Sequence, residues 1–333
     1  MKIQVQKIKL RLEHSFRLSR GTTNERENVV VEIDGHYGEG APLYYLGQTP
    51  DDIYNAAKGI LASFDFGRDF EYLRANPWPK ELIGFPRPAL CAVSQAIYGY
   101  LAAQDGRPLF EYLGLSEPKG IPTSFSFGIS KPGEIETFLR AKPDFPAYKL
   151  KLGSEYDLET VKRFRELSSA QLRLDVNGGW NYNEAIDKIE ALADYNIEFI
   201  EQPLAAGHYE ELDKLTSSAS IPIFVDEDMN RFSNLIELYG KAHGINVKLS
   251  KCGLLFDTLR IIQYAKQLGM KVLLGCMVES SIGITAALHL ATLADYIDLD
   301  GNLLINNDPF DGASTVMGIM NLQNRNGLGA IRK

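Results

Sequence analysis

Residues 147 to 178 read AYKLKLGSEYDLETVKRFRELSSAQLRLDVNG. The stretch opens with a short apolar run, continues through a segment with helical signals and closes with a second apolar run. Asp157 stands near the N-cap position of the expected helix. The stretch therefore predicts one β/α unit of a parallel sheet, in which a helix connects two strands.

Eight apolar runs of this kind follow one another from about residue 121, separated by roughly 25 residues each, which is the period of β/α units. Eight such units predict a TIM-type barrel. A doubly wound parallel sheet is the competing fold, but no GxGxxG motif follows a predicted strand. In chain order, the eight runs are TSFSFGI, AYKLKLG, LRLDVNG, IEFIEQP, PIFVDED, INVKLSK, KVLLGCM and YIDLDG.

The segments on either side of these runs have a different pattern. Residues 2–12 and 28–34 resemble antiparallel strands, and the polar residues between them, 19–27 (SRGTTNERE), are an expected loop. Helices are expected near 51–64 and 87–104, which makes this a small α+β unit. After the eighth run the chain is rich in Gly, Asn and Pro, so the last outer helix of the barrel is expected to be missing.

The composition limits the class of protein. The 333 residues include 35 Lys and Arg against 43 Asp and Glu, a net charge of −8, which argues against a nucleic-acid partner. Cys91, Cys252 and Cys276 have no CxxC spacing, so neither a disulfide framework nor a structural zinc site is expected. The first ten residues lack the apolar core of a signal peptide, and no run approaches ~18 apolar residues. A cytoplasmic protein without a membrane partner is predicted.

Acidic residues end three consecutive runs. In a barrel of this type the C-terminal ends of the strands face one shared cavity, so Asp175, Glu201 and Asp226 are expected to converge there. Any one of them could simply cap the following helix. Three in register, with no cation beside them in the sequence, favour a metal site instead. All-oxygen ligation indicates Mg²⁺, with Mn²⁺ as the alternative.

Lysines end two strands that are about halfway round the barrel from each other. Lys149 and Lys151 share one face of the second strand because they are two residues apart, and Lys248 and Lys251 end the sixth strand. Burial, a second ammonium and a divalent cation would all bring a lysine pKa nearer neutrality, which makes it usable as a base. The alternative, ion pairing with Asp and Glu, stays open for Lys149 and Lys251.

A base on each side of a metal-bound carboxylate supports a 1,1-proton transfer. One lysine would remove the α-proton, the metal and an ammonium would stabilise the enediolate, and the opposite lysine would return a proton to the other face. The α-carbon would be inverted. A Schiff-base lysine in an aldolase-type barrel is a rival interpretation, and a non-catalytic binding protein is a third.

Five motifs, AYKLKLG, LRLDVNGGW, FIEQPL, FVDED and NVKLSKCG, resemble the enolase superfamily and, within it, the muconate-cycloisomerase subgroup. The resemblance implies an α+β capping domain over residues 1–118, a (β/α)7β barrel over 119–305 and a C-terminal segment, 306–333, that returns to the cap. It also implies one Mg²⁺ per subunit. The implied site consists of the metal ligands Asp175, Glu201 and Asp226, the bases Lys151 and Lys248, the electrostatic helper Lys149, and Asn177 as a residue that orients a ligand.

The catalytic set is shared across the subgroup, so another feature must choose the substrate. Asp298 and Asp300, in DLDG, alternate onto one face, and this DxD resembles the signature with which dipeptide epimerases bind a substrate ammonium. Residues 16–26, FRLSRGTTNER, resemble the loop that selects the side chain of the second residue, and they contain Arg17, Arg20 and Arg26. Family members specific for Ala-Glu carry an arginine at about Gly21, one position from Arg20, so a broader Ala-X preference is equally open.

These features together predict a Mg²⁺-dependent dipeptide epimerase that inverts the C-terminal residue of L-Ala-X dipeptides, including L-Ala-D/L-Glu, such as those released from cell-wall peptides. An N-acylamino-acid racemase, an o-succinylbenzoate synthase and a muconate cycloisomerase of the same subgroup are the alternatives. The sequence leaves open whether the protein is a homo-oligomer.

Overall fold

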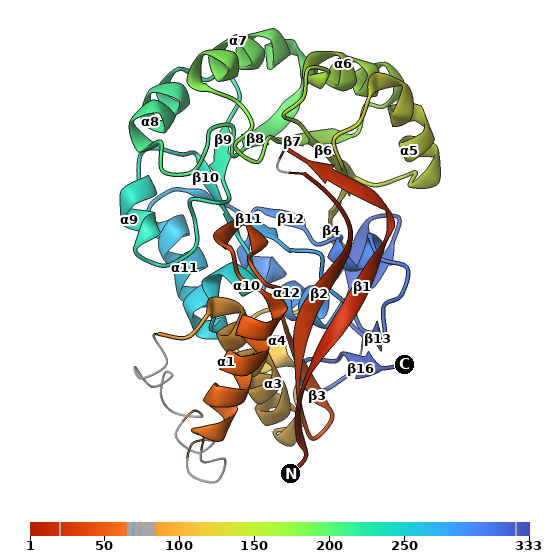
Figure 1. Cartoon of the computed structure of the whole chain (residues 1–333), viewed down its shortest axis with the longest axis vertical. Helices are drawn as coiled ribbons and strands as arrows, with labels where there is room; N and C mark the ends of the chain where they lie inside the picture. The colour runs from red at the N-terminus through yellow and green to blue at the C-terminus, as the bar shows by residue number, and fades with distance from the viewer. Residues whose placement is uncertain (20, 65–68, 70–72, 74–83, 324) are drawn as a thin grey trace.

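A computed structural model describes residues 1–19, 21–64, 69, 73, 84–323 and 325–333. Figure 1 shows the barrel in yellow-green to blue in the upper part of the molecule, and the N-terminal strands and helices in red to orange, rising along it from below. Within the described ranges, no helix combines the length and the apolar character needed to cross a membrane.

The barrel is an eight-stranded parallel sheet whose strand order follows the chain, so the predicted fold class is confirmed. The two ends of the sheet, β5 and β12, are joined by side chains. Thr123 Oγ1 accepts a hydrogen bond from Leu299 N at 2.8 Å, and Ser124 Oγ donates one to Asp298 Oδ1 at 2.6 Å. The strands are β5 (Ser124–Phe127), β6 (Ala147–Lys151), β7 (Gln171–Asp175), β8 (Ile197–Glu201), β9 (Ile223–Val225), β10 (Gly244–Val247), β11 (Lys271–Gly275) and β12 (Tyr296–Asp298).

Helices follow the first seven strands of the barrel. After β12 the described residues form a 3-10 turn (Gly301–Leu303) and short strands without any α-helix, as predicted for the missing last outer helix. The helices that follow the strands are α5 (Ile135–Ala141), α6 (Asp157–Leu167), α7 (Tyr182–Leu192), α8 (Tyr209–Ser218), α9 (Asn234–Leu238), α10 (Leu249–Cys252), α11 (Leu255–Gln267) and α12 (Ser281–Leu288).

The placement of Lys251 at the end of the sixth strand is wrong. Strand β10 ends at Val247, Lys248 is the N-cap of the one-turn helix α10, and Lys251 lies within that helix. Lys251 N donates to Lys248 O at 3.0 Å, so the backbone turns into a helix directly after Lys248. Both lysines still contact the Asp226 carboxylate.

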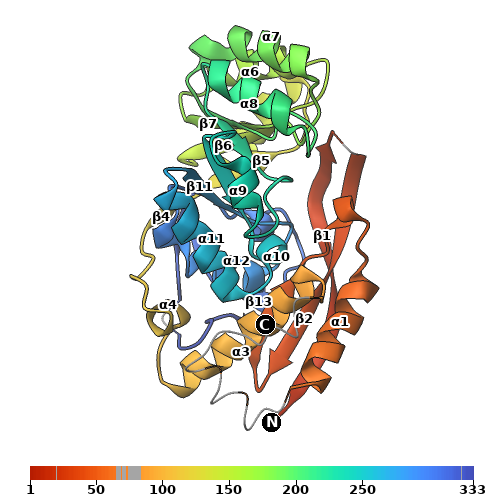
Figure 2. The same ribbon diagram turned by 90° about the vertical axis from the view of Figure 1, so that its left-hand side faces the viewer.

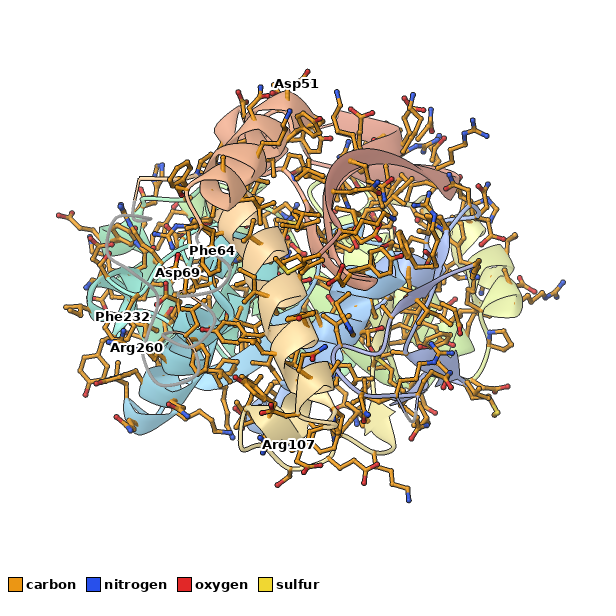
Figure 3. All side chains as sticks on the ribbon, turned by 90° about the horizontal axis from the view of Figure 1, so that it is seen from below. Asp51, Phe64, Asp69, Arg107, Phe232 and Arg260 are labelled. Carbon is orange, nitrogen blue, oxygen red and sulfur yellow. The ribbon has the colours of Figure 1, made fainter. Side chains whose placement is uncertain are left out.

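The N-terminal unit is an antiparallel sheet of β1 (Ile3–Leu18), β2 (Gly21–Ile33) and β3 (His36–Gly40), packed against the helices α1 (Pro50–Ala62) and α3 (Arg87–Gln104). Figure 3 shows α3 crossing the underside of the molecule beside α1, with Arg107 beyond its end. Strand β3 lies so close to α3 that a Cβ on Gly38 or Gly40 would stand 2.0 Å from a carbonyl oxygen of the helix.

The expected loop over residues 19–27 is wrong for most of its length. Strands β1 and β2 continue as a hairpin arm whose final cross-strand pairs include Phe16 with Thr23 and Leu18 with Gly21. Polar residues are tolerated there because the arm is largely solvent-exposed, and the backbone ladder holds it together. Figure 2 shows this arm standing upright beside the barrel.

The last part of the chain forms β13 (Phe310–Asp311), β14 (Ser314–Val316), β15 (Ile319–Asn321) and β16 (Ile331–Arg332). Strand β15 pairs with β4 (Ile121–Pro122), at the start of the barrel. Gly327 O accepts a hydrogen bond from Leu109 N at 2.7 Å, in the helix α4 (Leu109–Tyr112). The C-terminal segment thus contacts the segment that follows α3. The division at residues 118 and 305 stays a prediction.

Candidate active site

A cavity of about 410 Å³ opens at the C-terminal ends of the barrel strands, under the hairpin arm of β1 and β2. Small-molecule sites typically have volumes of roughly 300–1,000 Å³, so a dipeptide-sized ligand fits. Barrel residues that line it include Lys149, Lys151, Asn177, Asp226, Lys248, Asp298 and Asp300, and the N-terminal unit contributes Phe16, Leu18, Gly21, Thr22, Arg26 and Tyr44.

Three buried carboxylates stand at the ends of adjacent strands. Asp175 ends β7, Glu201 ends β8, and Asp226 directly follows β9. Burial raises the pKa of Glu201 to about 7, and the negative charge of Asp175 adds to the effect. Holding all three carboxylates ionised therefore costs free energy unless positive charge lies beside them.

Lysine ammoniums supply that positive charge. Lys149 Nζ lies 2.6 Å from Glu201 Oε2, 2.8 Å from Asp298 Oδ2 and 3.2 Å from Asp175 Oδ2. Lys151 Nζ contacts Asp175 and donates to Asn177 Oδ1 at 3.1 Å. Lys248 Nζ lies 2.8 Å from Asp226 Oδ2.

The expected fall of the lysine pKa includes the effect of a divalent cation and stays a prediction; the protein's own groups shift the pKa of Lys149 and Lys248 in the opposite direction. Burial opposes the charged form of each, but nearby carboxylates outweigh burial and raise both pKa values, well above the ordinary range for Lys149. Asp298 acts most strongly on Lys149, and Asp226 on Lys248. Both lysines are counter-ions here, so either becomes a base only when another cation takes over the carboxylate charge.

Lys151 and Lys248 approach the carboxylates from opposite sides. Strands β7, β8 and β9 lie between β6 and β10, so the two lysines are four positions apart around eight strands. Lys151 contacts Asp175 at one end of the carboxylate series and Lys248 contacts Asp226 at the other. The two lysines therefore flank the series of carboxylates.

The donor set fits Mg²⁺. All three groups are carboxylates on one rigid rim, which is the all-oxygen chemistry that Mg²⁺ prefers. Glu201 Oε2 is buried and accepts no well-formed hydrogen bond from the described residues, although Lys149 Nζ is close to it. In the described part of the chain, no three His, Cys, Asp or Glu side chains are already close enough together to hold a metal ion. Each of the three carboxylates has a lysine ammonium beside it.

Asp298 and Asp300 are both buried beside the cavity, but their partners differ. Asp298 accepts hydrogen bonds from Ser124 Oγ at 2.6 Å and from Lys149 at 2.8 Å. Burial opposes its ionisation, but Lys149 prevails and lowers the pKa of Asp298 to about 2. Asp300 accepts a hydrogen bond from Ser126 N at 2.6 Å, and burial together with Asp298 raises its pKa to about 6. Within the described chain, Asp300 makes no salt bridge.

The hairpin arm contributes Gly21 and Arg26 to the cavity wall, whereas Arg20 lies outside the described residues. Arg17 lines a separate cavity of about 120 Å³ between β1 and β5 and not the main one. The half-buried Arg26 donates to Thr23 Oγ1 at 2.6 Å, and its guanidinium lies 4.8 Å from the ring centroid of Tyr44. Burial lowers the pKa of Arg26, and no carboxylate in the described part of the chain forms a salt bridge with it.

Several polar residues around the site were not anticipated from the sequence. Ser124 and Ser126 alternate inward on β5 in the run TSFSF, a period-two signal that could have revealed them. Asn246 donates to Glu201 Oε1 at 2.7 Å from within the apolar strand β10. Lys251, for which the sequence left ion pairing open, contacts the Asp226 carboxylate and donates to Asp226 O at 2.6 Å, so it is an ion-pairing residue. Asn177, which was anticipated, accepts a hydrogen bond from Lys151 and donates one through Nδ2 to Glu227 Oε1 at 3.2 Å.

Comparisons with known proteins agree with this geometry. The family described as Enolase C-terminal domain-like matches residues 134–330. An L-Ala-D/L-amino acid epimerase from Flavobacterium johnsoniae is 31% identical over 99% of both chains, and an L-Ala-D/L-Glu epimerase from Bacteroides thetaiotaomicron is 31% identical over 100% of this chain and 88% of its own.

Solved structures are similar over nearly the whole chain. A dipeptide epimerase from Cytophaga hutchinsonii, complexed with Mg and D-Ala-L-Val, superposes with a TM-score of 0.89 at 28% identity, over 99% of this chain and 95% of its own. One from Enterococcus faecalis, complexed with Mg and L-Leu-L-Tyr, has a TM-score of 0.87 at 29% identity, over 99% of both chains. The chain therefore belongs to the enolase superfamily and, within it, to the dipeptide epimerase family.

Proposed function

We propose that the protein is a Mg²⁺-dependent dipeptide epimerase that inverts the α-carbon of the C-terminal residue. The observation that carries the proposal is the placement of Lys151 and Lys248 on opposite sides of three adjacent strand-end carboxylates. The Mg and dipeptide complexes of the Cytophaga and Enterococcus proteins support it.

Asp175, Glu201 and Asp226 would hold the metal. Bound there, Mg²⁺ supplies charge that neutralises these carboxylates and polarises the substrate carboxylate. The ammonium groups of Lys151 and Lys248 are then no longer needed as counter-ions, so one of them can lose its proton and act as a base.

The two lysines divide the proton transfer between them. The neutral amine takes the α-proton from one face, which leaves an enediolate, and the ammonium on the opposite strand delivers a proton to the other face. Lys149 is bound by three carboxylates and stays protonated, so its charge stabilises the enediolate oxygens without moving a proton.

The substrate's free amine would bind at Asp300, with Asp298 beside it, and the side chain of its second residue would lie under the hairpin arm near Gly21 and Arg26. L-Ala-X dipeptides, L-Ala-D/L-Glu among them, are the proposed substrates, with cell-wall peptides as their source. The three free cysteines suit a reducing cytoplasm as the location.

A dipeptide library in D₂O tests the function. With Mg²⁺, each epimerised dipeptide should gain one mass unit, and EDTA should abolish the gain. Exchange in N-succinyl amino acids but in no dipeptide would instead show an acylamino-acid racemase. Borohydride trapping of substrate together with indifference to EDTA would show a Schiff-base enzyme.

Lys151→Ala and Lys248→Ala should each lower the epimerisation rate by about 10²–10⁴-fold, because each removes one of two acid–base groups. One variant should still exchange the α-proton of a single stereoisomer, since the remaining amine reaches one face. Polarimetry and mass spectrometry in D₂O separate these outcomes. Lys162→Ala, on the exposed face of α6, is the matched control. Wild-type epimerisation in either active-site variant would refute the two-base scheme.

A further inference from the structure

Gln202 is a buried residue directly after Glu201, at the end of β8. Its backbone has a φ of 42°, in the left-handed region that non-glycine residues seldom adopt. Such a conformation persists only where the surroundings fix it. Here it accompanies a side chain that is hydrogen-bonded to the loop after β9, which carries Asp226.

All four hydrogen-bonding positions of the Gln202 carboxamide are occupied. Its Oε1 accepts from the backbone N–H groups of Asp226 at 2.8 Å and Glu227 at 2.9 Å. Its Nε2 donates to Leu204 O at 2.9 Å and to Asp228 Oδ2 at 2.7 Å. A glutamine side chain offers two acceptor sites and two donor hydrogens, whereas an ionised glutamate offers acceptor sites only.

These contacts join two proposed metal ligands through one residue. Glu201 is its chain neighbour, and Asp226 is held by its backbone N–H. Asp226 in turn contacts Lys248, one of the proposed bases. A shift of the loop after β9 would therefore move the Asp226 carboxylate relative to both Glu201 and Lys248.

We propose that Gln202 is a positioning residue that sets the distance between Glu201 and Asp226 for cation binding; this inference rests on the proposed function. It touches neither the substrate nor the cation. Outer hydrogen-bond partners of metal ligands typically contribute about 10–100-fold to metal affinity, so the effect is measurable without turnover.

Two substitutions distinguish a role of Gln202 in positioning the metal ligands from a role in merely supporting the loop after β9. Gln202→Glu preserves the size of the side chain and an acceptor for Asp226 N–H, but it places an oxygen opposite Asp228 Oδ2. Adding Asp228→Asn turns that repulsive pair back into a hydrogen bond and keeps an oxygen for Gly207 N, which now donates to Asp228 Oδ1 at 2.8 Å. Gln171→Glu makes the same exchange at the exposed start of β7 and is the matched control.

The measurement is calorimetric titration of MgCl₂ into each metal-free protein without dipeptide, with the melting temperature recorded alongside. Gln202→Glu should weaken Mg²⁺ binding by about 10–100-fold, Asp228→Asn in that background should recover at least about half of the loss on a logarithmic scale, and Gln171→Glu should stay within about twofold. If Gln202→Glu does not fold, Asp228→Asn alone should weaken binding by about threefold or more at an unchanged melting temperature.

Mg²⁺ affinity that is unchanged in Gln202→Glu, or in Asp228→Asn where that variant is used, would overturn the inference while the proposed function stands. A double variant that binds no better than Gln202→Glu would overturn it as well. Wild-type protein that binds no Mg²⁺ at all would overturn the proposed function and this inference together.

Discussion

Asp298 and Asp300 share one strand end but have different electrostatic partners. Asp298 is a partner of Lys149 and of Ser124, and its charge is already balanced. Asp300 accepts a hydrogen bond from Ser126 N, and burial holds its pKa at about 6. A substrate ammonium would therefore gain most from Asp300, whereas Asp298 chiefly maintains the charge and position of Lys149.

The Asp300→Asn variant should raise the KM for dipeptides by about tenfold or more, because it removes the carboxylate that lacks a cation. Asp298→Asn should instead lower kcat, because Lys149 loses its strongest partner. Steady-state kinetics with one dipeptide separates the two effects. Equal changes of KM in both variants would show that the two carboxylates bind the ammonium as a pair.

Arg26 lines the cavity, and it forms no salt bridge with a carboxylate in the described part of the chain. Its guanidinium stacks on the ring of Tyr44, which orients it. Arg26→Met keeps most of the side-chain volume and removes the charge. It should lower kcat/KM for L-Ala-L-Glu by about 10–100-fold and leave L-Ala-L-Val within about threefold, because a charge-assisted hydrogen bond is lost only with the acidic substrate. If both dipeptides respond alike, Arg26 supports the fold of the arm and does not select a substrate.

The residues of the candidate site differ in how far the sequence alone could predict them. Asp175, Glu201 and Asp226 end strands of a repeating unit, so their convergence follows from the barrel. The pairing of Lys149 with Asp298 was not predictable in the same way, because it joins strands that are far apart in the chain and depends on where the barrel closes. Gln202 stands in the FIEQPL motif, but its role was not predictable because it depends on a left-handed backbone and on contacts with the loop after β9.

Among the elements, the hairpin arm of β1 and β2 was the least predictable, because residues 19–27 are polar and resemble a loop. Its position is set by contacts with the barrel. Ile129 N donates to Arg17 O at 2.8 Å, and Ser19 Oγ donates to Asn177 O at 3.1 Å. The barrel strands, in contrast, are encoded by local apolar runs, and each predicted run overlaps one strand.

Ser19 of the arm packs on Gly179, where an added Cβ would lie 3.0 Å from Val176 O, 3.1 Å from Gly153 Cα and 3.2 Å from Ser19 Cβ. Gly179→Ala should displace Ser19 from the barrel and raise the KM for dipeptides several-fold, and crowding against the backbone of Val176 and Gly153 should also lower the melting temperature. Kinetics and thermal melting check this. Gly133→Ala, where a Cβ meets nothing within 4 Å, is the control. An unchanged KM would mean that the arm adjusts without loss of substrate contacts.

At the scale of the whole molecule, buried polar residues connect the barrel to the remaining parts of the chain. Glu39, on β3, accepts hydrogen bonds from Ser280 N, Ser280 Oγ and Gly283 N at the start of α12. Its carboxylate thus caps a barrel helix from the N-terminal unit. Such contacts bridge more than 240 positions along the chain, so local sequence patterns could not reveal them.

His289, just after α12, connects three segments. Its Nδ1 accepts a hydrogen bond from Phe110 N at 3.1 Å, and its Nε2 lies 2.9 Å from Leu328 O, which assigns the proton to Nε2. Burial lowers the pKa of His289 to about 4. The folded protein therefore keeps the ring neutral at pH values where the unfolded chain, with an ordinary pKa of about 6.5, takes up a proton.

The sign of the pH effect follows from this difference. The stabilisation is fully present above about pH 6.5 and is lost as the pH falls toward 4, so between about pH 7.5 and pH 5 the wild type should lose about 2 kcal/mol of unfolding free energy through this residue. His289→Gln can still accept from Phe110 N or donate to Leu328 O, but it does not titrate. Urea unfolding of both proteins at the two pH values isolates the contribution, because all other titrating groups are shared. Parallel losses in the two proteins would show that His289 is protonated in the folded state or that it titrates alike in both states.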